Sequence, residues 1–274
     1  MLEPSTVLVF LILGCSCGII HGKIVVRPAV SPAVGGSFYR FPHENGKYFE
    51  GDIILPAGLR AGSMSPRWRN GVVPYFIHRS FRPTERRAIY QAMQDIESKT
   101  CIEFKKRTNQ TDFVRITNLN QGCFSYVGRS GRSQQLNLGP GCMYKTTIIH
   151  ELVHAVGFWH EQSRHDRDRY ININWNNIPR NYWREFQKHS NLVNFGTVYD
   201  YRSVMHYSYN AFARDRSRPT ITSRRRNIAL RLLGAGDNAG GLTEIDALQI
   251  NRMYKCDPYR DYSYKIKSID LYES

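Results

Sequence analysis

One stretch, HELVHAVGFWH from His150 to His160, constrains the fold of this 274-residue chain more than any other. His150 and His154 are four residues apart, so on an α-helix both rings lie on one face. The surrounding residues are largely apolar, and we expect a helix over Thr146–Phe158 that is broken at Gly157. Glycine tolerates a positive φ, so the chain can turn back there and bring His160 toward the other two rings. The fold must therefore provide a largely apolar helix, a sharp turn and three converging imidazoles.

Three imidazoles at these intervals predict a metal site, and the neighbouring glutamate predicts a catalytic one. Zinc binds imidazole nitrogen, and a catalytic zinc keeps one position open for water. Glu151 follows the first histidine, so it lies beside the ion without binding it. Zinc lowers the pKa of bound water toward about 7, and a carboxylate there can take the proton and later give it to a leaving amine. A surface helix with solvated histidines is the alternative, which the apolar Val153, Val156 and Phe158 disfavour.

The same stretch and a second motif resemble the astacin family of zinc endopeptidases, within the metzincin clan. The family signature continues past His160 as EQSRHDRD, and YDYRSVMHYS resembles the methionine turn of metzincins. The resemblance runs from about Phe49 to Cys256. It implies one zinc per chain, held by the three histidines. It also implies that Met205 packs beneath the metal without binding it, and that Tyr207 swings toward the substrate and donates to the oxyanion.

The expected fold is α+β and similar to that of metzincins. The N-terminal half should have a mixed twisted sheet and two long helices, and the C-terminal half should be largely irregular and end in a helix. The first long helix is expected at Thr84–Thr100, capped by Thr84, and the last helix at Thr243–Lys255. The apolar face of the first helix should consist of Ile89, Ala92, Met93 and Ile96. Runs such as GVVPYFI, DFVRITNL and GCFSYVGR predict strands, and zinc should lie between the two halves.

A motif ahead of the catalytic region resembles the latency motif of astacin proenzymes. It reads FEGD and ends at Asp52, and the resemblance implies that Asp52 occupies the open zinc position. A carboxylate is a good zinc ligand and would displace the attacking water. An ordinary turn residue is the alternative reading of Asp52. Activation would then need cleavage near Arg60-Ala61 by another protease, and the resemblance implies that the new amino terminus is buried near Glu161.

The N-terminal residues predict a secretory leader. An apolar run from Val7 to Leu13 is followed by small residues suited to a signal peptidase, and it is too short for a permanent anchor. Glu3 stands where a positive charge is usual, so an uncleaved interfacial anchor is the alternative. The expected segments are a signal peptide at 1–22, a propeptide at 23–60, an astacin-like catalytic domain at 61–257 and a short tail at 258–274. We therefore expect a secreted, extracellular product without a transmembrane segment.

The cysteines agree with secretion. Four lie outside the expected leader, and an even number in a secreted chain predicts two disulfides. Three pairings are open on the residues alone. The resemblance implies Cys101–Cys256 and Cys123–Cys142. Asn109 begins the sequon NQT and is the expected glycosylation site.

The charge of the chain is strongly basic. It has 38 Lys and Arg against 23 Asp and Glu, a net charge of +15, which attracts acidic polymers or acidic substrates. A secreted chain rarely meets nucleic acid, so an anionic glycan is the favoured polymer, with a solvated basic surface as the alternative. The resemblance implies that a protein or peptide substrate binds in extended form along SYVGRSGRSQQLNLG. The hypothesis that acidic substrate residues are preferred rests on Arg129, Arg132, Arg202 and Arg214.

Two other functions fit the sequence less well. A catalytically inactive, basic binding protein on the same fold would be expected to lose Glu151 or one of the histidines, and all are present. A glycan-binding protein with structural zinc would be expected to offer four protein ligands. Three histidines and a movable tyrosine favour catalysis instead. The sequence therefore predicts a secreted zinc-dependent endopeptidase that is made as a latent proenzyme.

Overall fold

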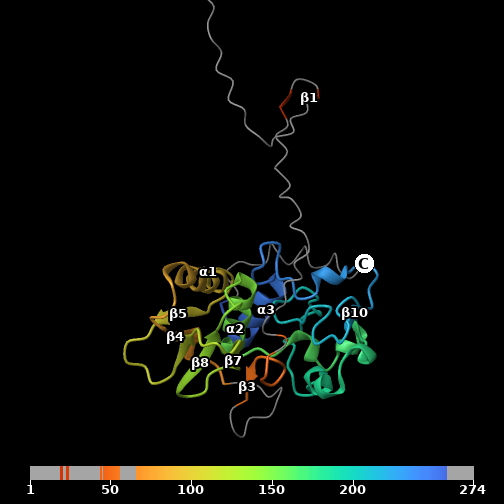
Figure 1. Cartoon of the computed structure of the whole chain (residues 1–274). Coiled ribbons are helices and arrows are strands. Elements are labelled where there is room, and N and C mark those ends of the chain that lie inside the picture. Colours follow the sequence, from red (N-terminus) through yellow and green to blue (C-terminus); the bar gives the residue numbers. More distant parts are fainter. Residues whose placement is uncertain (1–18, 21–22, 25–43, 45, 56–65, 258–274) are drawn as a thin grey trace, which may run out of the picture. The chain divides into compact units, whose positions relative to one another are not determined.

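The computed structural model describes residues 19–20, 23–24, 44, 46–55 and 66–257 (Figure 1). The chain divides into two compact units, Met1–Tyr39 and Arg40–Ser274. In the first unit, β1 (Ile19–Ile20) pairs antiparallel with β2 (Lys23–Ile24). Three expected features fall outside the described residues: most of the signal peptide, the cleavage site at Arg60-Ala61, and the tail at 258–274.

A six-stranded mixed sheet forms the N-terminal half of the second unit, with the strand order β3-β7-β8-β6-β4-β5. The strands are β3 (Ile53–Ile54), β4 (Val72–Ile77), β5 (Glu103–Lys106), β6 (Phe113–Thr117), β7 (Cys123–Tyr126) and β8 (Ser133–Leu138). Neighbouring strands run parallel except β7 and β8. β-Branched and aromatic residues dominate β4 and β6, which favours strands. The edge strand β3 comes from the expected propeptide.

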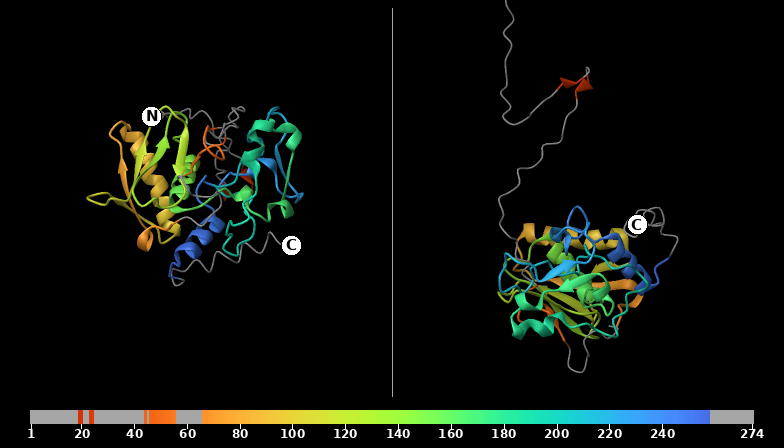
Figure 2. Two further views of the ribbon diagram at one scale, coloured as in Figure 1. Left: turned by 90° about the horizontal axis from the view of Figure 1, so that it is seen from below. Right: turned by 90° about the vertical axis from the view of Figure 1, so that its right-hand side faces the viewer.

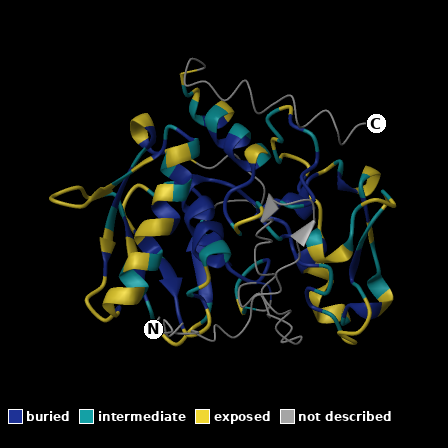
Figure 3. Ribbon diagram, turned by 90° about the horizontal axis from the view of Figure 1, so that it is seen from above, coloured by how far each residue is buried: buried dark blue, intermediate teal, exposed yellow. Residues whose placement is uncertain are grey.

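Two long helices accompany this sheet, as the sequence predicts. α1 (Pro83–Lys99) is amphipathic, and its buried face consists of Ile89, Ala92, Met93 and Ile96. α2 (Lys145–Val156) is apolar on most sides, and Thr147 to Val156 are all buried. α2 packs against α1, β7 and β8. Figure 3 shows the contrast, with α2 buried over most of its length and an exposed outer face on α1. α2 is therefore a rigid central element from which side chains can be held in fixed positions.

The C-terminal half is largely irregular, which confirms the expected division. Its regular strands are β9 (Ile171–Ile173) and β10 (Ile221–Ser223), which pair antiparallel. Short 3-10 helices are η1 (Arg69–Gly71) before the sheet and then η2 (Glu161–Ser163), η3 (Arg167–Arg169), η4 (Trp175–Asn177), η5 (Arg180–Phe186) and η6 (Leu230–Leu232). The half ends in α3 (Glu244–Tyr254). Thr243 caps α3, since its Oγ1 accepts from the Asp246 N–H at 2.9 Å.

The start of α1 differs from the expectation. The helix begins at Pro83, whose fixed φ suits the first helical position, so Thr84 already lies inside it. The cap is supplied by Glu85, whose Oε2 accepts from the Arg82 N–H at 2.8 Å. Two disulfides join distant elements: Cys101–Cys256 connects the ends of α1 and α3, and Cys123–Cys142 connects β7 to the approach to α2. Within the described ranges, no helix has the length and apolar character needed to cross a membrane.

Candidate metal and catalytic site

Three histidine side chains converge between the sheet and the C-terminal half. His150 and His154 project from α2, and His160 follows the turn at Gly157, where φ is 133°. The ring centroids lie 4.6 to 5.2 Å apart, and all three side chains are fully buried. Together with Asp52, their ligand atoms lie within 4.8 Å of one another. The structure thus brings together the residues that the histidine spacing and the FEGD motif single out.

The outward nitrogens of the first two rings are fixed by backbone carbonyls. His150 Nδ1 lies 2.6 Å from the Val204 carbonyl oxygen, and His154 Nδ1 lies 2.7 Å from that of Phe158. A carbonyl oxygen only accepts, so each Nδ1 must carry the proton. The lone pair is then on Nε2, which faces the centre of the cluster. Second contacts of this kind fix both the tautomer and the ring orientation of a metal ligand.

The distances within the cluster fit zinc. His150 Nε2 lies 3.3 Å from His160 Nε2 and 3.0 Å from Asp52 Oδ2, and Asp52 Oδ1 lies 3.5 Å from His154 Nε2 and 3.4 Å from His160 Nε2. A tetrahedron with zinc–ligand distances of about 2.0–2.1 Å has edges of about 3.3–3.4 Å. Asp52 Oδ1 and His154 Nε2 are buried and have no hydrogen-bond partner within the described part of the chain. A cation at the centre would satisfy both atoms.

Glu151 is the one acidic residue of α2, and it is fully buried. Both of its carboxylate oxygens lack a hydrogen-bond partner among the residues that the structure describes. Burial raises the pKa of Glu151 well above its ordinary value, and the charge of Asp52 raises it further. An unpaired buried carboxyl group is costly for folding alone. Its position next to a ligand therefore suits a proton-transfer role better than a structural one.

The expected propeptide supplies Asp52 to this cluster from a tight turn. Gly51 has a φ of 89°, and Ile53 N–H donates to the Phe49 carbonyl at 2.9 Å. Just after the turn, β3 pairs in parallel with the edge of β7, opposite Ser125 and Tyr126. Burial opposes ionisation of Asp52, but the neighbouring His160 and His154 hold its pKa well below the ordinary value. Figure 2 shows this orange segment between the sheet and the C-terminal half.

Tyr207 and Met205 lie on the C-terminal side of the cluster. Tyr207 is fully buried, its ring centroid is 4.8 Å from that of His160, and its hydroxyl donates to the Glu50 carbonyl at 2.7 Å. Met205 is buried in the apolar core that α1, α2, α3 and the six-stranded sheet share, and its carbonyl accepts from the Glu161 N–H at 2.9 Å. His206, which the sequence leaves without a role, is held by the Tyr199 hydroxyl at 2.8 Å from its Nε2.

Glu161 is buried beside two further acids, Asp200 and Asp246. Its Oε1 accepts from Arg164 Nη1 and from the Asp200 N–H, both at 2.9 Å. Burial raises the pKa of Glu161, and the charge of Arg164 opposes that rise. Residue 61, the expected new amino terminus, lies outside the described residues, so its pairing with Glu161 stays a prediction. Asn109, the expected glycosylation site, is exposed in the loop after β5.

The sequence reasoning missed Glu50, which contacts His160, and two residues that hold Glu50 in place. Glu50 is fully buried, and its Oε2 lies 2.7 Å from His160 Nδ1. Its Oε1 accepts from Ser163 Oγ at 2.8 Å and from His189 Nε2 at 2.6 Å. Burial opposes ionisation of Glu50, but the hydrogen bonds from His160 and His189 lower its pKa to about 2. The signal that could have pointed to Glu50 is its place in the FEGD motif, two residues before Asp52.

Comparison with known proteins places this fold and site among the zinc peptidases. The family model described as "Astacin", which defines a peptidase family, matches residues 61–255. The solved structure of high choriolytic enzyme 1, a hatching enzyme zinc-protease from Oryzias latipes, is similar with a TM-score of 0.64 and 39% identity. The match covers 71% of this chain and 95% of that one. The chain therefore belongs to the astacin family.

Relatives identified by sequence agree with this assignment. Zinc metalloproteinase nas-6 of Caenorhabditis elegans is 41% identical over 191 residues, which are 69% of this chain and 54% of that protein. Astacin-like metalloendopeptidase of Mus musculus is 41% identical over 210 residues, which are 73% of this chain and 48% of that protein. The chain spans about half the length of these relatives.

Proposed function

We propose that this chain is a secreted zinc-dependent endopeptidase that is made as a latent precursor. The observation that carries the proposal is the cluster of His150, His154, His160 and Asp52, in which the fourth ligand comes from outside the family domain. A catalytic zinc site has three protein ligands and one position for water. Here a removable carboxylate stands at that fourth position. The proposed segments are the signal peptide 1–22, the propeptide 23–60, the catalytic domain 61–257 and the tail 258–274.

The residues around the metal have distinct roles in this proposal. When bound, zinc supplies a Lewis acid that polarises a peptide carbonyl and acidifies a water molecule. Glu151, unpaired and buried beside the ligands, accepts the proton of the attacking water and passes it to the leaving amine. Tyr207 donates a hydrogen bond to the oxyanion that forms. Its hydroxyl is held by the Glu50 carbonyl in the precursor, so this role requires the propeptide to leave.

Latency follows from what the propeptide occupies. Asp52 fills the ligand position, and β3 covers the edge of β7. An extended peptide can bind by adding a strand to an open sheet edge. Cleavage near Arg60-Ala61 by an activating protease would release both, and would free the β7 edge for a protein or peptide substrate in extended form. The amino terminus released by that cleavage is proposed to pair with Glu161.

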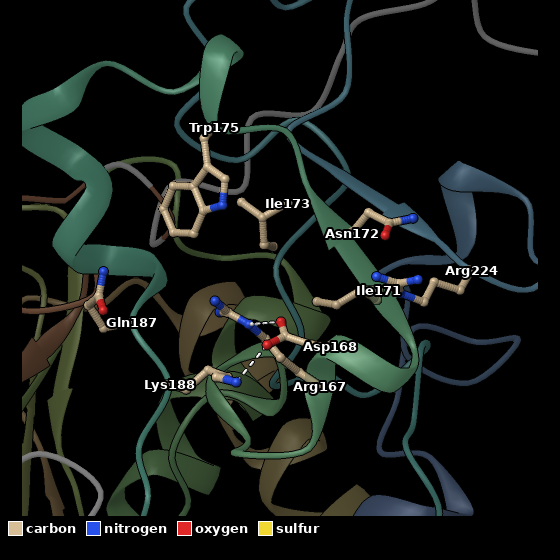
Figure 4. Close-up of a pocket in the computed structure, with 9 residues that line it drawn as sticks. All are labelled: Arg167, Asp168, Ile171, Asn172, Ile173, Trp175, Gln187, Lys188 and Arg224. Atoms are coloured by element: carbon tan, nitrogen blue, oxygen red, sulfur yellow. Dashed lines mark hydrogen bonds and ion pairs between the residues drawn. The ribbon is translucent and has the colours of Figure 1, made fainter.

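An anionic glycan is the proposed further partner, and a basic pocket supports it. The pocket has a volume of about 580 Å³ and is lined mainly by residues of β9 and its surroundings. Figure 4 shows Arg167, Lys188 and Arg224 around it, with Trp175 as an aromatic wall. Asp168 pairs with Lys188 at 2.5 Å and with Arg167 at 3.3 Å, so the lining carries three cations and one carboxylate. An excess of positive charge beside an aromatic ring suits a sulfated or carboxylated sugar.

The experiment that separates the enzyme from an inactive binding protein is Glu151→Gln in the activated chain. The variant should keep stoichiometric zinc and lose about 10²- to 10⁴-fold in turnover of a denatured protein substrate, because the proton acceptor is gone. Glu103→Gln is the matched control, since Glu103 is a half-exposed carboxylate paired with Lys105 far from the metal ligands in sequence. Full activity of Glu151→Gln would refute the role of Glu151 as proton acceptor. An unmodified activated chain that binds zinc but cuts nothing would favour the binding protein.

The latency proposal has its own variant. Asp52→Asn in the uncleaved chain removes the charge of the fourth ligand and nearly preserves its shape. The uncleaved variant should show weak proteolysis, because β3 still covers the edge of β7, whereas the uncleaved unmodified chain should show none. If neither uncleaved protein shows proteolysis and both are fully active after cleavage, Asp52 is not the latency switch.

A further inference from the structure

Glu50 makes five hydrogen bonds to residues of the region around the histidine cluster. Its carboxylate accepts from three side chains, its N–H donates to Glu185 Oε2 at 2.6 Å, and its carbonyl accepts from Tyr207. The residue is fully buried and has a φ of 48°, a left-handed conformation that non-glycine residues rarely adopt. Such a conformation persists only where the surroundings over-determine it. The turn is therefore built to place this carboxylate.

The outer contacts of the three histidines differ in origin. His150 and His154 are held by carbonyls of Val204 and Phe158, which belong to the family domain and remain after any cleavage before it. His160 is held by Glu50, which lies before that domain. Removal of the propeptide therefore takes away the outer contact of one ligand and leaves the other two intact.

The contact to His160 is also chemically different. A carboxylate that accepts from an imidazole N–H makes a charge-assisted hydrogen bond, which is stronger than one to a carbonyl. It raises the basicity of the opposite nitrogen, which is the one that faces the metal. Ser163 and His189 both donate to Oε1, so the other oxygen, Oε2, is turned toward His160. Two donors thus fix the orientation of the carboxylate, and its other oxygen accepts a hydrogen bond from His160.

We propose that Glu50 is a metal-positioning residue of the precursor, which holds His160 as a zinc ligand and strengthens zinc binding for as long as the propeptide is attached. The inference rests on the proposed zinc site. It concerns the outer nitrogen of His160, whereas Asp52 stands at the fourth ligand position. In this view, one short turn performs two functions: Asp52 blocks the site, and Glu50 completes the surroundings of the third histidine. The metal is loaded and kept while the chain is latent.

The test compares two isosteric changes in the full-length precursor. Glu50→Gln removes the charge behind His160. Glu44→Gln makes the same isosteric substitution in another buried acid before the family domain, whose Oε2 accepts from Ser208 Oγ at 2.6 Å rather than from a ligand. The comparison is made at a pH above about 7, because burial raises the pKa of Glu44 to about 7. Zinc affinity is measured by competition with a chromophoric chelator, and the visible spectrum of the cobalt-substituted protein reports the ligand field. Loss of an outer-shell partner typically weakens metal affinity about 10- to 100-fold.

We expect Glu50→Gln to weaken zinc binding at least about 10-fold and to shift the cobalt spectrum, and Glu44→Gln to change neither. Ser163→Ala leaves Oε2 in place but loosens its orientation, so it should weaken zinc binding by a smaller factor. This third variant keeps the test decisive if Glu50→Gln does not fold. Unchanged zinc affinity in Glu50→Gln, or an equal loss in Glu44→Gln, would overturn the inference and leave the zinc peptidase intact. A precursor that binds no zinc at all would overturn both.

Discussion

The turn after α2 makes a quantitative prediction for Gly157→Ala. Gly157 has a φ of 133° and ψ of 16°, and its N–H donates to the Val153 and His154 carbonyls. A side chain at such a φ costs about 1–3 kcal/mol in backbone strain. A Cβ there would also lie 2.7 Å from Met253 Cε, the end of a flexible side chain, and this overlap adds about 1 kcal/mol. The free energy of unfolding should therefore fall by about 2–4 kcal/mol.

The matched control for this prediction is Gly131→Ala. Gly131 also has a positive φ, 80°, but nothing lies within 4 Å of the position of an added Cβ. Only the left-handed backbone is strained there, at about 1–2 kcal/mol. Both variants are measured by urea unfolding of the zinc-loaded precursor, followed by tryptophan fluorescence. The Gly157 variant should lose more stability than the control.

The same variant should also affect the metal. We expect strain at Gly157 to shift the adjacent Phe158, whose carbonyl fixes Nδ1 of His154 at 2.7 Å. Zinc affinity should therefore fall in Gly157→Ala and stay unchanged in Gly131→Ala. If Gly157→Ala is no less stable than Gly131→Ala and binds zinc equally well, the argument that this glycine is required for the three-histidine turn is refuted.

Three further predictions concern the disulfide, pH and metal removal. Opening Cys101–Cys256 by two Cys→Ser changes frees a loop of 155 residues and should cost up to about 5 kcal/mol in urea unfolding; a loss below about 1 kcal/mol would contradict the chain-entropy argument. Burial, and then the charge of Asp246, raise the pKa of Asp200 from 3.8 to about 8, so the folded state keeps a proton that the unfolded state releases. The free energy of unfolding should therefore decrease as pH rises from 3.8 to about 8, and Asp200→Asn should flatten that dependence. An unchanged pH profile in the variant would contradict this assignment. Adding zinc at about 100 times its dissociation constant to the metal-free precursor should stabilise it by about 2.7 kcal/mol, seen as a higher thermal midpoint, whereas an unshifted midpoint would speak against a folded-state site.

The sequence predicts the local parts of the site well. The His150 and His154 spacing is a property of one helix, and the glycine turn follows within the same stretch, so both can be derived without a fold. The buried face of α1 and the position of α3 follow in the same way from apolar periodicity. Helix ends are harder, because Thr84 and Pro83 compete for the first turn and proline suits the first helical position.

The long-range parts could not be predicted. The contact between Glu50 and His189 joins residues 139 positions apart, and no periodicity or spacing links them. The sheet order places β3 beside β7, although β4, α1, β5 and β6 lie between them in the chain, and such pairing depends on tertiary packing. The contacts that hold His160 are therefore visible only once the expected propeptide and the C-terminal half are seen together.

The most direct measurement is proteolysis of a denatured protein by the full-length chain before and after limited cleavage near Arg60-Ala61, with and without a zinc chelator. A latent zinc endopeptidase predicts activity only after cleavage, its loss with chelator and its return with added zinc. The contrary result is a cleaved chain with the new amino terminus confirmed and one zinc bound that cuts nothing. Activity that survives full removal of zinc would contradict the account equally.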